Sequence, residues 1–325
     1  MANYSSKTKE IMSAAVERIL AKIKESDGGK LPWQRGFKVV GVGPRSYATG
    51  ELYRGGNWAL LYAVQMLYGY SGYWISFERA KRDFETVDTD GNKVYGGVRK
   101  GEKGWPVIFP VNVSYQAEDK RGNKQFNADG SPTMTSYTTY RAHMMFSLSQ
   151  CERPVYPEIE DAELPYAAEG DAAIDAIIKA LSDLTIIEEY GRTPAYSPAT
   201  DVVYMPAKAQ YNSTEEYYSD LFHEVTHWTG ERLGRFSREN WKNEGREDYG
   251  YEELVAETAS MIALAKLGIN KPEIEAGNAA YVQNWMAALE NNPEWLWLAA
   301  IDAAKAVDWI FNGGQFPEYD TTESA

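Results

Sequence analysis

The chain has 325 residues, of which 44% are hydrophobic and 13% aromatic, and its formal net charge is −14. This length accommodates one large domain or two modest ones, and this composition excludes a globally disordered protein. The single cysteine, Cys151, excludes an internal disulfide framework, and we expect it to be a tolerated free thiol.

The start of the chain predicts an amphipathic helix and not a signal peptide. Ile11, Ala15, Ile19 and Ile23 recur at helical spacing with charged residues between them. No later stretch approaches the roughly 20 consecutive apolar residues that a membrane span needs. We therefore expect a soluble protein in a reducing cytoplasm, without membrane contact.

The charge is divided unequally between the two halves of the chain. Residues 1–150 contain 21 Lys+Arg and 14 Asp+Glu, a balance of +7, whereas residues 151–325 contain 12 and 33, a balance of −21. Such asymmetry indicates that the halves have different partners, although two ordinary surfaces of different composition would also account for it.

The first half alternates helical and strand-like segments, which predicts an α+β fold. Helices are expected over residues 5–26, 57–68 and 77–84, and strands over residues 93–98, 105–116 and 135–149. An acidic stretch with three prolines then predicts a linker over residues 152–170. The expected domains are therefore residues 1–151 and residues 171–325.

The second half reads as mostly helical, with one small β-hairpin formed by residues 192–196 and 201–205. Ser213 and Glu216 have capping-box spacing, so a helix is expected from there to Thr229, ended by Gly230. Further helices are expected over residues 173–184, 252–267 (ended by Gly268), 279–290 and 294–311.

His223, Glu224 and His227 form an H-E-x-x-H motif inside the helix that Ser213 begins. Residues four apart lie on the same helix face, about 6 Å apart, a geometry that suits two imidazole ligands of a tetrahedral Zn²⁺. Glu224 flanks this face, where it can take a proton from water activated by the metal. The alternative is two histidines at accidental spacing, but the chain has three histidines in all and the motif uses two of them.

A catalytic zinc of this kind needs a third protein ligand and an open position. The next predicted helix offers Glu253 and Glu257, which share a face, so we assign Glu253 to the metal and Glu257 to a hydrogen bond with a ligating imidazole. Glu252 is the rival ligand and is expected to face solvent. The nearby strand Val202–Met205 is a candidate edge strand for an extended substrate, or else a buried strand of the core.

Residues 53–105 interleave cations with aromatic residues, a composition that suits single-stranded nucleic acid, which is held by cationic grooves and base-stacking platforms. Aromatic side chains are more often part of a core. Of the six aromatics in question, we expect at least half to be buried; they are Tyr53, Trp58, Tyr73, Trp74, Phe77 and Trp105.

The chain resembles the ArdC family of antirestriction proteins over nearly its whole length. The matching strings are YRGGN (53–57), YWISF (73–77), VRKGEKG (98–104), FSLSQ (146–150), AYSPATDVVYMP (195–206), HEVTHWTG (223–230) and EELVAE (252–257). FSLSQ departs from the family's usual FNVDQ. The resemblance implies an N-terminal domain that binds single-stranded DNA, followed by a zincin-like metallopeptidase domain, and a role in protecting mobile DNA from host restriction.

These observations together predict one Zn²⁺ per chain, or another divalent metal, with single-stranded DNA and a host protein as partners. The alternative is a DNA-binding or DNA-mimicking protein whose metal site is structural and not hydrolytic. The residues expected to contact DNA are Tyr53, Arg54, Asn57, Trp58, Trp74, Lys81, Arg99, Lys100 and Lys103.

Overall fold

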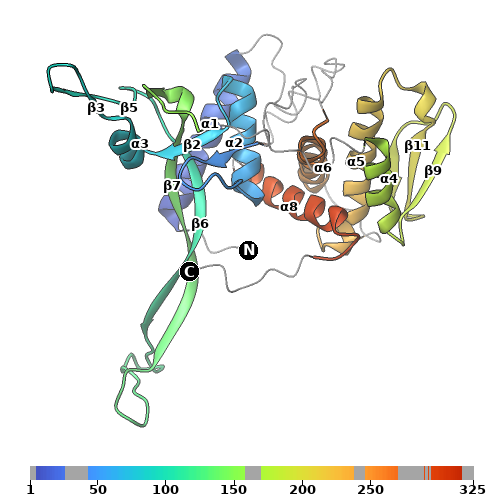
Figure 1. The fold of residues 1–325 in the computed structure, drawn as a ribbon. Coiled ribbons are helices and arrows are strands. Elements are labelled where there is room, and N and C mark those ends of the chain that lie inside the picture. Colours follow the sequence, from blue (N-terminus) through green and yellow to red (C-terminus); the bar gives the residue numbers. More distant parts are fainter. Residues whose placement is uncertain are drawn as a thin grey trace.

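The structure is a computed structural model that describes residues 5–25, 43–157, 170–237, 246–269, 289, 292 and 294–316. It is an α+β fold in which helices α1, α2 and α8 lie between two separate sheets (Figure 1). Within the described parts of the chain, every helix is too short or too polar to cross a membrane.

The first half is built on a four-stranded sheet with the order β1-β2-β7-β6. Its strands are β1 (Arg45–Ser46), β2 (Tyr73–Ser76), β6 (Trp105–Gln116) and β7 (Met134–Ser147). β6 and β7 form a long antiparallel hairpin whose far end extends beyond the body (Figure 1). Helices α1 (Ser6–Glu25) and α2 (Gly55–Tyr68) cover the near end and bury Trp74 and Trp105.

A smaller cluster flanks this sheet around α3 (Phe77–Phe84). Its short strands are β3 (Thr86–Val87), β4 (Lys93–Val94), β5 (Gly97–Val98) and β8 (Cys151–Glu152). Cys151 is a buried free thiol, and burial raises its pKa to about 11, so it has little thiolate character at neutral pH.

The second half combines a three-stranded sheet with helices. β9 (Thr185–Glu189), β10 (Ala195–Ser197) and β11 (Val202–Pro206) have the order β10-β11-β9, with β11 in the centre. The helices are α4 (Asp171–Ala180), α5 (Thr214–Arg232), α6 (Arg246–Leu267) and α8 (Glu294–Phe311).

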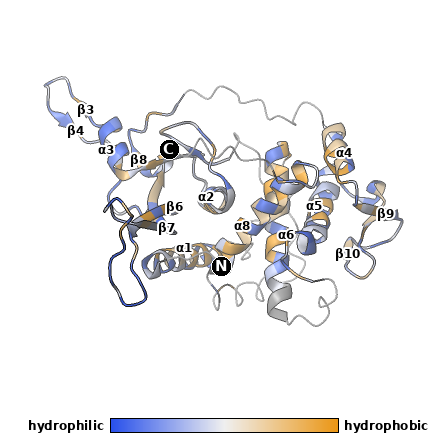
Figure 2. Cartoon of the chain, turned by 90° about the horizontal axis from the view of Figure 1, so that it is seen from below, coloured by the Kyte–Doolittle hydropathy of each residue, from blue (hydrophilic) through white to orange (hydrophobic). Residues whose placement is uncertain are grey.

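Helix α8 joins the two halves, because it packs against α2 as well as against α6. The approach to α2 is close: a Cβ on Gly56 would lie 2.8 Å from Ile301 Cγ1. One hydrophobic core therefore runs from α1 and α2 through α8 to α5 and α6, and Figure 2 shows hydrophobic colouring along α1, α6 and α8. The boundaries 1–151, 152–170 and 171–325 stay a prediction, but the two halves share a core.

Most sequence-based elements agree with the structure to within a few residues, and several features differ. α6 begins at Arg246 instead of residue 252, and the two-residue strands β1, β3 and β8 were not expected. β9 was not expected, and it takes up the residues just after an expected helix that ends early, at Ala180. α5 continues past Gly230 to Arg232. Gly230 is not a helix terminator but the contact point for Phe236, whose Cε1 would lie 1.9 Å from an added Cβ. The helix expected over residues 279–290 lies almost wholly outside the described residues.

Candidate metal centre

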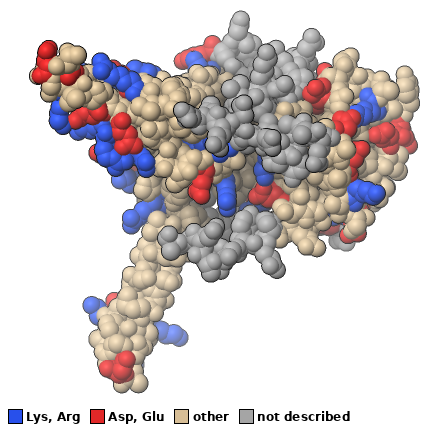
Figure 3. Space-filling view, in the orientation of Figure 1, with Lys and Arg blue, Asp and Glu red and all other residues tan. Residues whose placement is uncertain are grey.

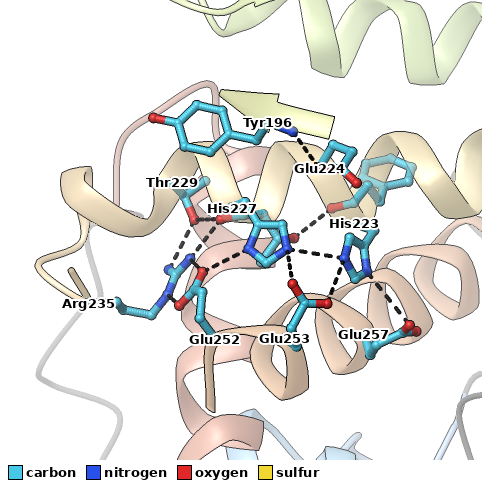
Figure 4. Close-up of polar contacts among 11 residues, drawn as sticks. Tyr196, His223, Glu224, His227, Thr229, Arg235, Glu252, Glu253 and Glu257 are labelled. Carbon is cyan, nitrogen blue, oxygen red and sulfur yellow. Dashed lines mark hydrogen bonds and ion pairs between the residues drawn. The ribbon is translucent and has the colours of Figure 1, made fainter. Parts of the chain in front are cut away.

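Helix α5 presents the H-E-x-x-H motif to helix α6. Its first turn is fixed by Ser213, whose hydroxyl accepts a hydrogen bond from the Glu216 backbone N–H at 3.2 Å, as the sequence predicted. Burial of apolar residues between the two helices then sets the rotation of α5, so that His223 and His227 face α6 (Figure 4).

Three side chains converge between these helices. The Nε2 atoms of His223 and His227 lie 3.1 Å apart. Glu253 of α6 places one carboxylate oxygen 3.6 Å from His223 Nε2 and the other 3.4 Å from His227 Nε2. The three ligand atoms all lie within 4.8 Å of one another. Ligands at about 2.0–2.1 Å from a tetrahedral zinc are about 3.3 Å apart, so this donor set fits such an ion.

Two further carboxylates support the imidazoles from behind. Glu257 Oε1 lies 3.9 Å from His223 Nδ1, and Glu252 Oε1 lies 3.4 Å from His227 Nδ1 (Figure 4). The expectation that Glu252 faces solvent was therefore wrong, because its side chain is 5% exposed. A carboxylate that accepts a hydrogen bond from the second ring nitrogen fixes the tautomer and the orientation of a metal-binding histidine. Glu252 is within that range of His227, whereas Glu257 lies beyond it from His223.

Arg235 explains why Glu252 can be buried. Its Nε and Nη2 atoms donate to the two oxygens of Glu252, each at 2.8 Å, and the Arg235 side chain is also 5% exposed. Arg235 further donates to Thr229 Oγ1 at 3.0 Å and to the Thr226 carbonyl at 2.7 Å. Sequence reasoning missed Arg235, because it lies in the loop after α5, where no periodic pattern indicates burial.

The electrostatics of the cluster favour an anionic Glu253. Burial acts to raise the pKa of Glu253, but its contacts with the two imidazoles outweigh burial and hold the pKa well below the usual range. For His227, burial acts to lower the pKa, and the carboxylates of Glu252 and Glu253 reverse this and raise it to about 10. A divalent cation would replace the protons that these carboxylates attract to the imidazoles.

Glu224 flanks the two histidines on α5, on the side of the helix that faces the small sheet. Its Oε2 accepts a hydrogen bond from the Tyr196 backbone N–H at 2.6 Å (Figure 4). Tyr196 is in β10, the edge strand beside α5. The candidate edge strand Val202–Met205 is instead the central strand β11, with Val203 and Met205 fully buried. The sheet edge that borders the site is therefore β10.

The structure corrects several of the expected DNA contacts. Trp58 and Trp74 belong to the core, and Trp74 donates its indole N–H to Gln65 Oε1 at 3.2 Å, so neither ring is available to stack on a base. Asn57 uses its amide to bind the backbone N–H and C=O of Ile108, which fastens α2 to β6.

The remaining candidates divide into structural and exposed side chains. Arg99 donates to the Cys151 carbonyl at 3.0 Å and pairs with Glu102 at 2.9 Å, so it holds the loop together. Tyr53 is half-buried, and burial raises its pKa to about 12. Four cations remain exposed, and their contact with DNA stays a prediction; they are Arg54, Lys81, Lys100 and Lys103.

Of the six aromatics, Trp58, Trp74 and Trp105 are buried, whereas Tyr53 and Tyr73 are half-buried and Phe77 is exposed, so the expectation that at least half are buried is confirmed. The surface around α3 carries many cations (Figure 3), but it also carries acids. Arg79 and Arg82, for example, both pair with Asp83.

Comparison with known proteins identifies both halves. Residues 9–146 match the family model of the N-terminal domain of the anti-restriction factor ArdC, and residues 172–302 match that of a zincin-like metallopeptidase. The second half is thus a zincin-like metallopeptidase domain, with the motif of α5 at its centre.

Solved structures extend the match over both halves. The metal-free crystal structure of the antirestriction protein ArdC from plasmid R388 is 28% identical, with a TM-score of 0.64, covering 95% of this chain and 100% of that one. The Mn(II)-bound structure of the same protein has a TM-score of 0.59 and covers 94% of this chain and 98% of that one. The chain therefore has the ArdC-type architecture, an ArdC N-terminal domain followed by a zincin-like metallopeptidase domain.

A curated relative carries a similar sequence within a longer protein. The DNA primase TraC of Escherichia coli is 30% identical over 319 residues. These residues are 95% of this chain and 28% of the primase, so the chain spans little more than a quarter of that relative.

Proposed function

We propose that this protein protects mobile DNA from restriction, that its first half binds single-stranded DNA and that its second half carries a zinc-dependent peptidase site. The observation that carries the peptidase is the convergence of His223, His227 and Glu253 within 4.8 Å, with Glu224 next to the first ligand. We place this activity in the host cytoplasm.

In this proposal His223, His227 and Glu253 hold the zinc ion. When bound, the ion supplies Lewis acidity, which polarises a scissile carbonyl and lowers the pKa of a coordinated water. Glu224 acts as general base toward the attacking water and then delivers the proton to the leaving amine. Its hydrogen bond with the Tyr196 N–H orients the carboxylate on the β10 side of α5.

The proposed division of labour follows the charge. Residues 1–150 carry a balance of +7 and residues 151–325 a balance of −21, so DNA phosphates are attracted to the first half and repelled by the second. The likeness of this chain to part of a protein named as a DNA primase supports a function on DNA. The peptidase substrate in this proposal is a host protein, either a restriction factor or another protein. Coating of single strands by the first half is by itself sufficient for protection.

The −21 balance of residues 151–325 also favours a second candidate. In this alternative the acidic half mimics DNA and occupies the DNA groove of a restriction enzyme, while the metal has a structural role. The two candidates differ in whether a protein is cleaved.

The deciding experiment measures metal content by mass spectrometry and cleavage of restriction enzyme subunits by the full chain. We expect about one Zn²⁺ per chain and cleavage that Glu224→Gln abolishes. Metal retention without cleavage of any subunit, together with a stable complex between the chain and a restriction enzyme, would support the DNA mimic.

A further inference from the structure

The far part of the long hairpin stands away from the rest of the protein. We call this part the arm; it consists of residues 109–116 of β6 and residues 134–141 of β7. Figures 1 and 3 show it extending from the body as a narrow two-stranded ribbon. A two-stranded ribbon is marginally stable in water, and its two faces are both open to a partner.

The two faces of the arm differ in chemistry. Side chains alternate along a strand, and directly paired residues share a face. The register pairs Phe109 with Arg141 and Val113 with Tyr137, so these residues lie on one face together with Tyr115. We call this the aromatic face.

The opposite face of the arm is polar. In the middle of the arm this face carries Asn112 and Ser114 from β6, and Ser136 and Thr138 from β7. Gln116 and the exposed Met134 follow at its far end, and Pro110 and Tyr140 lie next to the body. The Thr138 hydroxyl donates to Asn112 Oδ1 at 2.8 Å, which confirms that these two side chains lie on the same side of the ribbon.

Exposed rings are grouped in two places along the aromatic face. Tyr115 and Tyr137 meet edge to face with ring centroids 5.8 Å apart, and they are 49% and 48% exposed. Phe109 meets His143, at the base of the arm, in the same way at 5.5 Å. Positions 109 and 115 are separated by about 20 Å along the strand, a length that about six stacked nucleotides span.

The strands of the hairpin lack the acidic residues that give the whole chain its negative net charge. The chain contains 47 acidic residues, yet neither the 12 residues of β6 nor the 14 residues of β7 include Asp or Glu. Arg141 and His143 are both exposed on these strands. Figure 3 shows no acidic colouring on the two strands of the arm, whereas the connection between them, residues 117–133, carries both acidic and basic side chains. DNA phosphates that contact the strands of the arm are therefore not repelled by carboxylates of those strands.

We propose that the aromatic face of the arm binds single-stranded DNA, with bases stacking on Tyr115, Tyr137 and Phe109 and with Arg141 contacting the phosphate backbone. This inference rests on the proposed DNA-binding function and names the surface that performs it. Single strands are held without sequence preference by aromatic rings on which bases stack and by cations that contact the backbone. The aromatic face offers exposed rings for the first and Arg141 for the second. These rings replace the buried Trp58 and Trp74 as stacking platforms.

The test uses the full-length protein and a fluorescein-labelled oligothymidylate of 20 nucleotides, with affinity measured by anisotropy. We expect Tyr115→Ala and Tyr137→Ala each to weaken binding by at least about five-fold, because one stacked base contributes about 1–3 kcal/mol. Tyr115→Phe and Tyr137→Phe keep the ring and should retain affinity. Arg141→Gln should lower the salt dependence by about 0.7 in log–log slope. Ser114→Ala with Ser136→Ala, on the polar face, is the matched control.

Each other outcome overturns the inference in a distinguishable way. If the parent protein binds the oligonucleotide and the alanine variants bind equally well, the arm is not the DNA surface, although the proposed function stands. If the parent protein does not bind, both proposals fail. If light scattering shows a dimer that Tyr115→Ala dissociates, with unchanged DNA affinity, the aromatic face joins two copies of this chain instead.

Discussion

Arg235 and Glu252 form a bidentate ion pair directly behind the candidate metal centre, with both donor–acceptor distances at 2.8 Å. Glu252 in turn lies 3.4 Å from His227 Nδ1. The His227 Nε2 atom, on the far side of the ring, faces the other two ligand atoms. Arg235 is therefore a positioning residue for His227, on which it acts through Glu252.

Replacing Arg235 with Met should weaken metal binding by about 10–100-fold, the usual effect of losing support behind a ligand. It should also destabilise the fold by about 3–5 kcal/mol, because Glu252 is left buried without its partner. Isothermal titration with Zn²⁺ and chemical denaturation measure the two effects. Arg192→Met is the matched control, because Arg192 pairs with Glu189 at the surface and both side chains are about half exposed. Equal metal affinity in both variants would contradict the positioning role.

The ligand assignment predicts a graded series on α6. Glu253→Ala should abolish high-affinity metal binding, as should His223→Ala and His227→Ala, because each removes one of three converging ligand atoms. Glu257→Ala should weaken binding about 10–100-fold without abolishing it. Metal content after dialysis measures the series. If Glu252→Ala loses all metal while Glu253→Ala keeps it, the ligand is the neighbouring residue.

How far the sequence predicts this protein depends on whether the deciding contacts are local. The helix over residues 294–311 and the strand over residues 105–116 are recovered with the same limits, because hydrophobic periodicity is a local signal. β9 was missed because its five residues pair in parallel with β11, the second strand of the hairpin that comes next in the chain. Such pairing leaves no local signal in a short strand.

The candidate metal centre also contains contacts that local sequence patterns predict and one that they do not. Helical spacing brings His223 and His227 to one face, and it places Glu253 and Glu257 together. It does not distinguish a buried Glu252 from an exposed one, because that depends on Arg235 from a different segment. Similarly, the sequence suggests two halves, whereas α8 packs against both, so a fragment ending at residue 150 would expose the α2 surface that α8 covers.

Gly230 should resist substitution even though it lies inside a helix. An added Cβ would lie 1.9 Å from Phe236 Cε1, so Gly230→Ala should destabilise the protein by about 1–3 kcal/mol through overpacking. Gly250, in α6, has no atom within 4 Å of the equivalent position, so Gly250→Ala should be neutral or stabilising by up to about 1 kcal/mol. Denaturant midpoints compare the two variants. Similar effects from both would contradict the close Gly230–Phe236 contact.

Metal affinity should rise with pH between about 6 and 9. In the metal-free protein the carboxylates of Glu252 and Glu253 overcome burial and raise the pKa of His227 to about 10, so the imidazole is protonated at neutral pH. A metal ion needs the neutral imidazole and must displace this proton, so protons compete with the metal below pH 10. We expect up to about tenfold tighter binding per pH unit for each proton released. Titration in buffers of different ionisation enthalpy measures the release, and its absence would contradict a protonated His227.

The last prediction tests whether peptidase and DNA binding are separable. Glu224 is placed to move a proton and is not among the converging ligands, so Glu224→Gln should keep the metal and the fold while stopping hydrolysis. The arm lies on the other half of the molecule, so the DNA affinity of Glu224→Gln should equal that of the parent at the same salt concentration. Loss of DNA affinity together with hydrolysis would show that the halves act as one unit.

Transfer of unmodified plasmid DNA into a restricting host then decides the role of the peptidase. We expect Glu224→Gln to protect as well as the parent, because a single strand coated by the first half presents no duplex recognition site. The matched comparison is Tyr115→Ala combined with Tyr137→Ala, which should keep hydrolysis and lose protection. Protection lost by Glu224→Gln with intact DNA binding would instead make proteolysis of a host factor the mechanism of defence.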